Sequence, residues 1–128
     1  MRLLMDTHTF LWFLWADPQL SASARSLIED EANEKYISLI SLWEIAIKVS
    51  VGKLTLAKPF GEYIQEQIAL NGFQILPLRL EHIVQVVSLP FHYRDPFGRL
   101  LAAQSLSEAM PLLSIDAVLD PYGVSRLW

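Results

Sequence analysis

Short apolar runs that lead directly into helix signals recur along this chain, and they constrain its fold more than any other feature. Residues 2–5 form such a run, which lacks the polar/apolar alternation of a half-exposed strand. Strands without that alternation are typical of parallel sheets covered on both faces. Strand and helix signals alternate to the end of the chain, which predicts a three-layer α/β/α sandwich around a mostly parallel sheet of about four to five strands.

The expected elements follow from capping, turn and periodicity signals. The predicted strands are residues 2–5, 35–38, 74–76 and 112–115, and the predicted helices are residues 7–15, 21–32, 41–51, 59–70, 80–87 and 96–110. A short helical turn is expected after residue 116, and the direction of a last strand around residues 124–127 stays open. Repeats, low-complexity segments and linkers are absent, so residues 1–128 are predicted to form one domain.

Composition excludes several classes of protein. With 52% hydrophobic residues the chain is not expected to be disordered, and its net charge of −4 disfavours non-specific binding to nucleic-acid phosphates. A bound metal could still supply the positive charge that a nuclease needs. The absence of cysteine excludes disulfides and thiolate zinc sites, and it fits a cytoplasmic protein. No apolar stretch approaches the roughly 20 residues of a membrane span, and a secretory signal is not recognisable.

Four acidic residues lie where apolar runs meet expected helices: Asp6, Glu44, Asp95 and Asp116. Taken singly, each has a structural explanation. Asp6, Asp95 and Asp116 suit helix N-caps, and Ser41 with Glu44 fits the S-x-x-E capping box.

Taken together, the same acids predict a functional site. The carboxyl ends of parallel strands meet at one edge of a sheet, so Asp6 and Asp116 would be neighbours if the first and last predicted strands are adjacent. Clustered carboxylates repel one another, and a hard cation relieves that repulsion. One or two Mg²⁺ or Mn²⁺ ions would suit such ligands and could activate water towards a phosphodiester. The pattern therefore indicates a metal-dependent hydrolase.

Four motifs carry a resemblance to a known family. They are Met5-Asp6-Thr7-His8, Ser41-Leu42-Trp43-Glu44-Ile45, the segment from His92 to Gln104, and Leu113-Ser114-Ile115-Asp116. In order and spacing they resemble the PIN domain, most closely the VapC-type toxins of bacterial toxin–antitoxin pairs.

This resemblance implies a PIN-like α/β fold and an endoribonuclease that depends on Mg²⁺ or Mn²⁺. It also implies a small antitoxin partner that blocks the site, and a homodimer of the toxin. By position, Asp6, Glu44 and Asp116 match the acids expected to bind the metal, and Asp95 joins them as a candidate catalytic residue. Water would then attack the RNA phosphate in line.

One position departs from the family's pattern. Members usually read Asp-Pro-Phe-Asp-Arg where this chain reads Asp95-Pro96-Phe97-Gly98-Arg99, so an expected acid is missing at Gly98. Glycine is also less favourable than alanine inside a helix by about 1 kcal/mol. Three accounts stay open: Asp95 substitutes, water fills the gap, or the change inactivates the chain. We expect impaired activity, and we expect Gly98→Asp to raise metal-dependent RNA cleavage.

The basic residues near the acids have alternative explanations. Lys48 lies one turn after Glu44, where it could form a plain i,i+4 ion pair or contact phosphate. Arg99 is expected to contact RNA or to orient a carboxylate. The histidines have no metal-ligand spacing and are expected to be structural or surface residues: His8, His82 and His92.

The chain has four tryptophans, Trp12, Trp15, Trp43 and Trp128, and core packing is expected for most of them. Trp12 and Trp15 lie on the first expected helix, which is apolar almost all round. Something must cover part of that helix, and a second subunit or a partner helix would do so because interfaces favour aromatic residues.

Two other functions remain to be weighed. A non-catalytic protein would keep the fold and the antitoxin surface, with a site degraded at Gly98. A magnesium-dependent phosphatase or phosphoacceptor domain fits less well, because the phosphatase pattern needs a second Asp where this chain has His8.

Overall fold

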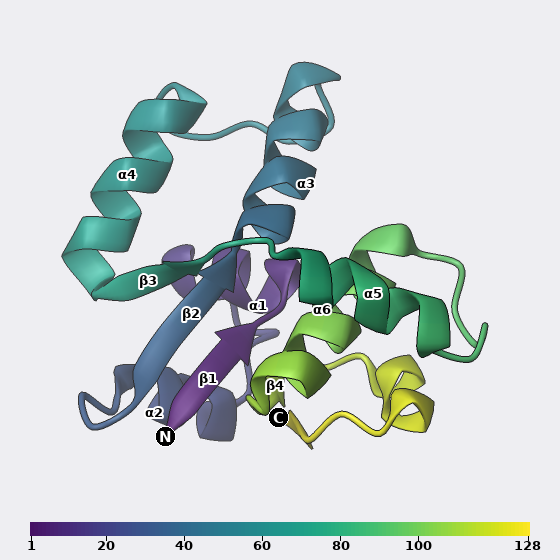
Figure 1. The fold of residues 1–128 in the computed structure, drawn as a ribbon. Coiled ribbons are helices and arrows are strands. Elements are labelled where there is room, and N and C mark those ends of the chain that lie inside the picture. Colours follow the sequence, from purple (N-terminus) through teal and green to yellow (C-terminus); the bar gives the residue numbers. More distant parts are fainter.

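Five short strands form one parallel sheet in the order β3-β2-β1-β4-β5 (Figure 1). The computed structural model describes residues 1–128. The strands are β1 (Arg2–Met5), β2 (Glu34–Ser38), β3 (Phe73–Leu76), β4 (Leu112–Leu113) and β5 (Arg126–Leu127). Every neighbouring pair is parallel, and β1 lies at the centre between β2 and β4. The first strand and the strand near residue 112 are therefore adjacent, which is the condition for their terminal acids to meet.

Helices cover both faces of the sheet and complete the predicted three-layer fold. They are α1 (Thr7–Leu14), α2 (Ala22–Glu29), α3 (Leu39–Ser50), α4 (Phe60–Asn71), α5 (Leu80–Ser88), α6 (Pro96–Glu108) and the 3₁₀ helix η1 (Ala117–Tyr122). Successive residues of β1 face opposite sides, as in any strand. Met5 packs into a core with α1 to α4, whereas Leu4 packs into a second core with α5, α6 and η1.

The start of α3 differs from the prediction. The helix begins at Leu39, and the Ser38 hydroxyl caps it by accepting the Ile40 N–H at 3.0 Å. Ser41 therefore lies inside the helix, and its buried hydroxyl oxygen has no hydrogen-bond partner. The predicted capping box of Ser41 and Glu44 is wrong, because β2 runs into α3 without a loop.

The last strands are shorter than predicted. β4 ends at Leu113, and in the segment that follows it the Ser114 hydroxyl accepts the N–H of Asp116 at 3.0 Å. The open question of the final strand is answered by β5, which runs parallel to β4. None of the helices is long and apolar enough to cross a membrane.

Candidate active site at the carboxyl edge of the sheet

The acids Asp6, Glu44, Asp95 and Asp116 all line one pocket of about 60 Å³ at the carboxyl edge of the sheet. Each comes from a different part of the fold: the end of β1, the second turn of α3, the start of α6 and the turn after β4. The other lining residues are Thr7, His8, Tyr93, Gly98, Leu101 and Leu119. The sheet order thus gathers residues that are far apart in the sequence.

Asp6 is the most firmly held of these acids. It is only 8% exposed, and its Oδ1 accepts the Thr9 N–H at 2.8 Å as the N-cap of α1. Its Oδ2 accepts the hydroxyl of Ser114, which is fully buried. Each carboxylate oxygen keeps a second lone pair that a cation could use. The N-terminal end of α1 also favours a negative charge at this place.

Glu44 is held from two sides. The Thr7 hydroxyl donates to its Oε1 at 2.7 Å, and the Lys48 ammonium lies 3.1 Å from its Oε2. The first contact ties α1 to α3 across the pocket. The i,i+4 ion pair with Lys48 is therefore present, while a phosphate contact by Lys48 stays a prediction.

Asp116 and Asp95 also line the pocket. Asp116 Oδ1 accepts the Val118 N–H at 3.3 Å, and its Oδ2 accepts the Tyr93 hydroxyl at 3.4 Å. Asp95 accepts the Phe97 N–H at 3.0 Å and caps α6. Asp6, Asp95 and Asp116 thus each cap a helix, as the sequence predicts, and line the pocket as well.

The donor set suits a hard divalent cation in its chemistry, since the acids offer only oxygen atoms. As placed, no three acidic or histidine side chains lie close enough together to share one ion. Mg²⁺ usually takes one or two carboxylates and completes its octahedron with water. The residues present therefore fit a magnesium or manganese ion that keeps several waters.

The pocket also contains polar residues that the sequence does not mark as site residues, namely Thr7, His8 and Tyr93. Tyr93 enters from the loop between α5 and α6, and burial followed by the charges of Asp116 and Asp95 raises its pKa. Its hydroxyl therefore keeps its proton at neutral pH and acts as a donor. His8 lies on α1 two residues after Asp6, is exposed at the surface as expected, and also lines the pocket. Nothing in the local sequence around Tyr93 marks it as a pocket residue.

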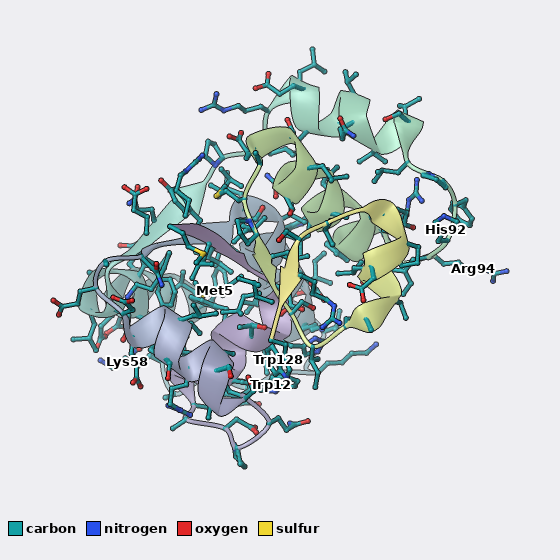
Figure 2. The ribbon with its side chains drawn as sticks, turned by 90° about the horizontal axis from the view of Figure 1, so that it is seen from below. Met5, Trp12, Lys58, His92, Arg94 and Trp128 are labelled. Atoms are coloured by element: carbon teal, nitrogen blue, oxygen red, sulfur yellow. The ribbon has the colours of Figure 1, made fainter.

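Arg99 lies away from the carboxylates. Its guanidinium donates to the carbonyls of Pro90 and Val86 and to the Tyr122 hydroxyl, and it stacks over Phe91. Arg99 therefore orients no carboxylate here, and its contact with RNA stays a prediction. Arg94 points away from the protein at its outer edge (Figure 2).

The other histidines and the tryptophans are divided between core and surface. His82 is fully buried and His92 is exposed. Trp12 packs against Trp128 with ring centroids 6.0 Å apart (Figure 2). Trp15 is 42% exposed and Trp43 is 59% exposed, so neither is a core residue.

Comparison with known proteins adds a family match. The sequence profile of the PIN domain family matches residues 3–123. Ribonuclease VapC16 of Mycobacterium tuberculosis is 33% identical over 69 residues, which cover 51% of this chain and 48% of that protein. The chain thus spans about half the length of the curated relative that it matches.

Several solved structures have a similar fold. VapBC2 from Rickettsia felis, bound to a DNA fragment from its promoter, gives a TM-score of 0.74 at 16% identity over 99% of this chain and 98% of that chain. FitAcB from Neisseria gonorrhoeae gives 0.67 at 17% identity over 98% and 96%. A toxin–antitoxin complex from Klebsiella pneumoniae gives 0.66 at 16% identity over 98% and 96%. At these identities the likeness establishes the fold.

Proposed function

Because the chain belongs to the PIN domain family, we propose that it is a metal-dependent endoribonuclease and the toxin of a toxin–antitoxin pair. The observation that carries the proposal is the meeting of four carboxylates from four separate elements in one pocket. The curated relative is named a ribonuclease, and one of the similar structures is a toxin–antitoxin complex. Both descriptions support the same assignment.

Asp6, Glu44 and Asp116 are the candidate ligands, of which one or two would hold the cation directly while water completes its shell, and Asp95 is a further candidate catalytic residue. Mg²⁺ or Mn²⁺ would supply positive charge for the phosphodiester and make water more acidic. Asp6 is suited to a fixed ligand because the Thr9 N–H and the Ser114 hydroxyl set its orientation. The Thr7 hydroxyl does the same for Glu44. The preset orientation of these oxygens avoids the cost of ordering them when the ion binds.

RNA would enter from the open side of the pocket. Water would attack phosphorus in line with the leaving oxygen, so that a new P–O bond forms while the old one breaks. The water would lose one proton, and the leaving oxygen would gain one. His8 lines the pocket and Lys48 lies beside Glu44, which supports both as candidates for contacting the phosphate. Arg99 is a more distant candidate for contacting the RNA strand.

Cleavage of a mixed cellular RNA pool tests this proposal directly. We expect cleavage in Mg²⁺ or Mn²⁺, no cleavage in EDTA, and a loss of at least about a hundredfold in Asp6→Asn, as expected when a group that stabilises the transition state is removed. Asp30→Asn is a matched control, since Asp30 is an exposed acid outside the pocket. Equal cleavage by the wild type and Asp6→Asn would reject the assignment.

We further propose an antitoxin protein as partner, a homodimer, and action in the cytoplasm. The similar solved structures include toxin–antitoxin assemblies, which supports a protein partner of that kind. Co-expression with a candidate antitoxin should suppress RNA cleavage, and a stable complex should elute together in size-exclusion chromatography.

One observation favours a second candidate. Because no three acids are close enough to share an ion, the chain could be a PIN domain protein that binds its antitoxin without cutting RNA. This alternative predicts a stable antitoxin complex together with no cleavage of any RNA at any Mg²⁺ or Mn²⁺ concentration.

A further inference from the structure

Tyr93 brings a phenol hydroxyl into the acidic pocket. It lies in the loop before α6 and lines the pocket beside Asp95, Gly98 and Asp116. Its hydroxyl lies 3.4 Å from Asp116 Oδ2. The loop therefore places a hydrogen-bond donor, the Tyr93 hydroxyl, among carboxylates, which are hydrogen-bond acceptors.

Gly98 makes room for this ring. A Cβ atom at position 98 would lie 2.8 Å from Tyr93 Cε1 and 3.3 Å from Cδ1, and the first distance is shorter than real Cβ contacts allow. The backbone of Gly98 is helical and needs no positive φ, so conformation does not explain the glycine. The glycine is explained by the Tyr93 ring, which occupies the space that a Cβ atom at position 98 would need.

Tyr93 completes the support of Asp116. The Val118 N–H holds one carboxylate oxygen and the Tyr93 hydroxyl holds the other. The backbone N–H of Asp116 donates to Ser114, whose hydroxyl donates to Asp6. One chain of hydrogen bonds thus runs from Tyr93 through Asp116 and Ser114 to Asp6, and it fixes the relative orientation of the two strand-end acids.

We propose that Tyr93 is a positioning residue of this pocket, which orients Asp116 towards a divalent cation from a space that exists only because residue 98 is glycine. The proposal rests on the proposed function for the identity of the ligand. Tyr93 and Gly98 therefore act as a pair, and a side chain at position 98 requires the ring at position 93 to shift from this place.

The steric half of the proposal can be tested without metal, by thermal unfolding in EDTA. Alanine is a better helix former than glycine, so Gly98→Ala should raise the Tm in a Tyr93→Ala background. In the presence of Tyr93 the same change should lower the Tm, because the Cβ meets the ring. An equal Tm shift of Gly98→Ala in both backgrounds would overturn the pairing.

The positioning half can be tested by equilibrium binding of Mn²⁺ to Tyr93→Phe, which keeps the ring and loses the hydroxyl. Removing a hydrogen bond that orients a metal-binding side chain typically weakens metal affinity about 10- to 100-fold, and we expect a loss in that range with little change in Tm. Tyr36→Phe is the matched control, since Tyr36 lies on β2 outside the pocket. Unchanged Mn²⁺ affinity in Tyr93→Phe, or no Mn²⁺ binding by the wild type, would overturn the proposal.

These measurements separate the two proposals. Weaker Mn²⁺ binding by Tyr93→Phe in a protein that cuts no RNA would support the role of Tyr93 and reject the nuclease. RNA cleavage together with unchanged Mn²⁺ affinity in Tyr93→Phe would support the nuclease and reject the role of Tyr93.

Discussion

At the scale of single residues, the acids of the pocket have two tasks at once. Asp6, Asp95 and Asp116 each accept a backbone N–H at the start of a helix, and each also lines the pocket. Both tasks were predictable from the sequence because capping and strand ends follow local rules. Tyr93 was not predictable, since its place depends on how the loop before α6 folds back over Gly98.

Because Asp6 both caps α1 and lines the pocket, Asp6→Asn and Asp6→Ala should differ in stability although both remove the carboxylate. Asp6→Asn keeps an oxygen for the Thr9 N–H, whereas Asp6→Ala removes the cap. Loss of an N-cap typically costs about 0.5–2 kcal/mol, so Asp6→Ala should be less stable than Asp6→Asn by about that amount. Urea unfolding in EDTA measures the difference. Equal stability of the two variants would mean that the cap contributes nothing.

Tyr93 changes the outcome expected for Gly98→Asp. The sequence alone predicts that an added acid raises metal-dependent RNA cleavage, but any Cβ at position 98 meets the Tyr93 ring. We now expect the single variant to gain little activity and the Tyr93→Ala/Gly98→Asp variant to gain more. Initial rates of RNA cleavage in Mn²⁺ compare the two, with Tyr93→Ala alone as the control. A single variant that matches or exceeds the double one would show that the ring yields easily.

At the scale of elements, the predicted helices and strands are close to the observed ones wherever a local signal marks the boundary. Pro96 starts α6 and Gly72 ends α4 in a left-handed conformation, as such residues usually do. The sequence places the start of α3 at Ser41, whereas Ser38 caps the helix in the structure. Both serines suit an N-cap, but only the Ser38 hydroxyl also donates to Gln104 of α6. The sequence of neither segment alone predicts this tertiary contact.

The packing of α5 on α6 includes a contact between the buried His82 and the partly exposed Glu108. The Arg79 N–H donates to His82 Nδ1 at 3.0 Å, so His82 Nε2 carries the proton and donates to Glu108 at 2.9 Å. This hydrogen bond lowers the pKa of Glu108 below its ordinary value of 4.5. A depressed carboxyl pKa stabilises the fold above the unfolded-state pKa, and that stabilisation is lost as the pH falls through the folded-state value.

We therefore expect Glu108→Gln to be less stable than the wild type at neutral pH, with the difference shrinking below the ordinary glutamate pKa of 4.5. Urea unfolding between neutral and acidic pH measures this dependence. Glu29→Gln, which changes an exposed acid on α2, is the control and should show no comparable trend. A difference that stays constant across the range would contradict the assigned role of ionised Glu108.

At the scale of the whole molecule, the sequence predicted the layers but not the strand order. Continuous apolar strands with intervening helices imply a covered parallel sheet, and the structure has one. The position of β1 between β2 and β4 depends on which helices cover which face of the sheet. That arrangement depends on the packing of both hydrophobic cores, which involves residues far apart in the sequence. The sequence therefore predicts that Asp6 and Asp116 are neighbours only if β1 and β4 are adjacent, and the structure shows that these strands are.

The outer surface of α1 bears on the proposed homodimer. Trp12 is covered in part by Trp128, while Trp15 stays 42% exposed at the end of the helix. If a second subunit covers this end, Trp15→Glu should shift the protein from dimer to monomer. Light scattering coupled to size-exclusion chromatography measures the mass, with Val87→Glu on the exposed face of α5 as the control. A dimer that survives Trp15→Glu would place the interface elsewhere.

The order in which a ribosome makes this chain has a consequence for the cell that makes it. The pocket takes its first acid from residue 6 and its last from residue 116 of 128, and the strand that presents the last acid pairs with β5 at the very end. A growing polypeptide that already carries Asp6, Glu44 and Asp95 still lacks Asp116. We therefore expect the proposed RNA cleavage only once Asp116 and the strand β5 that pairs with β4 have been made and folded.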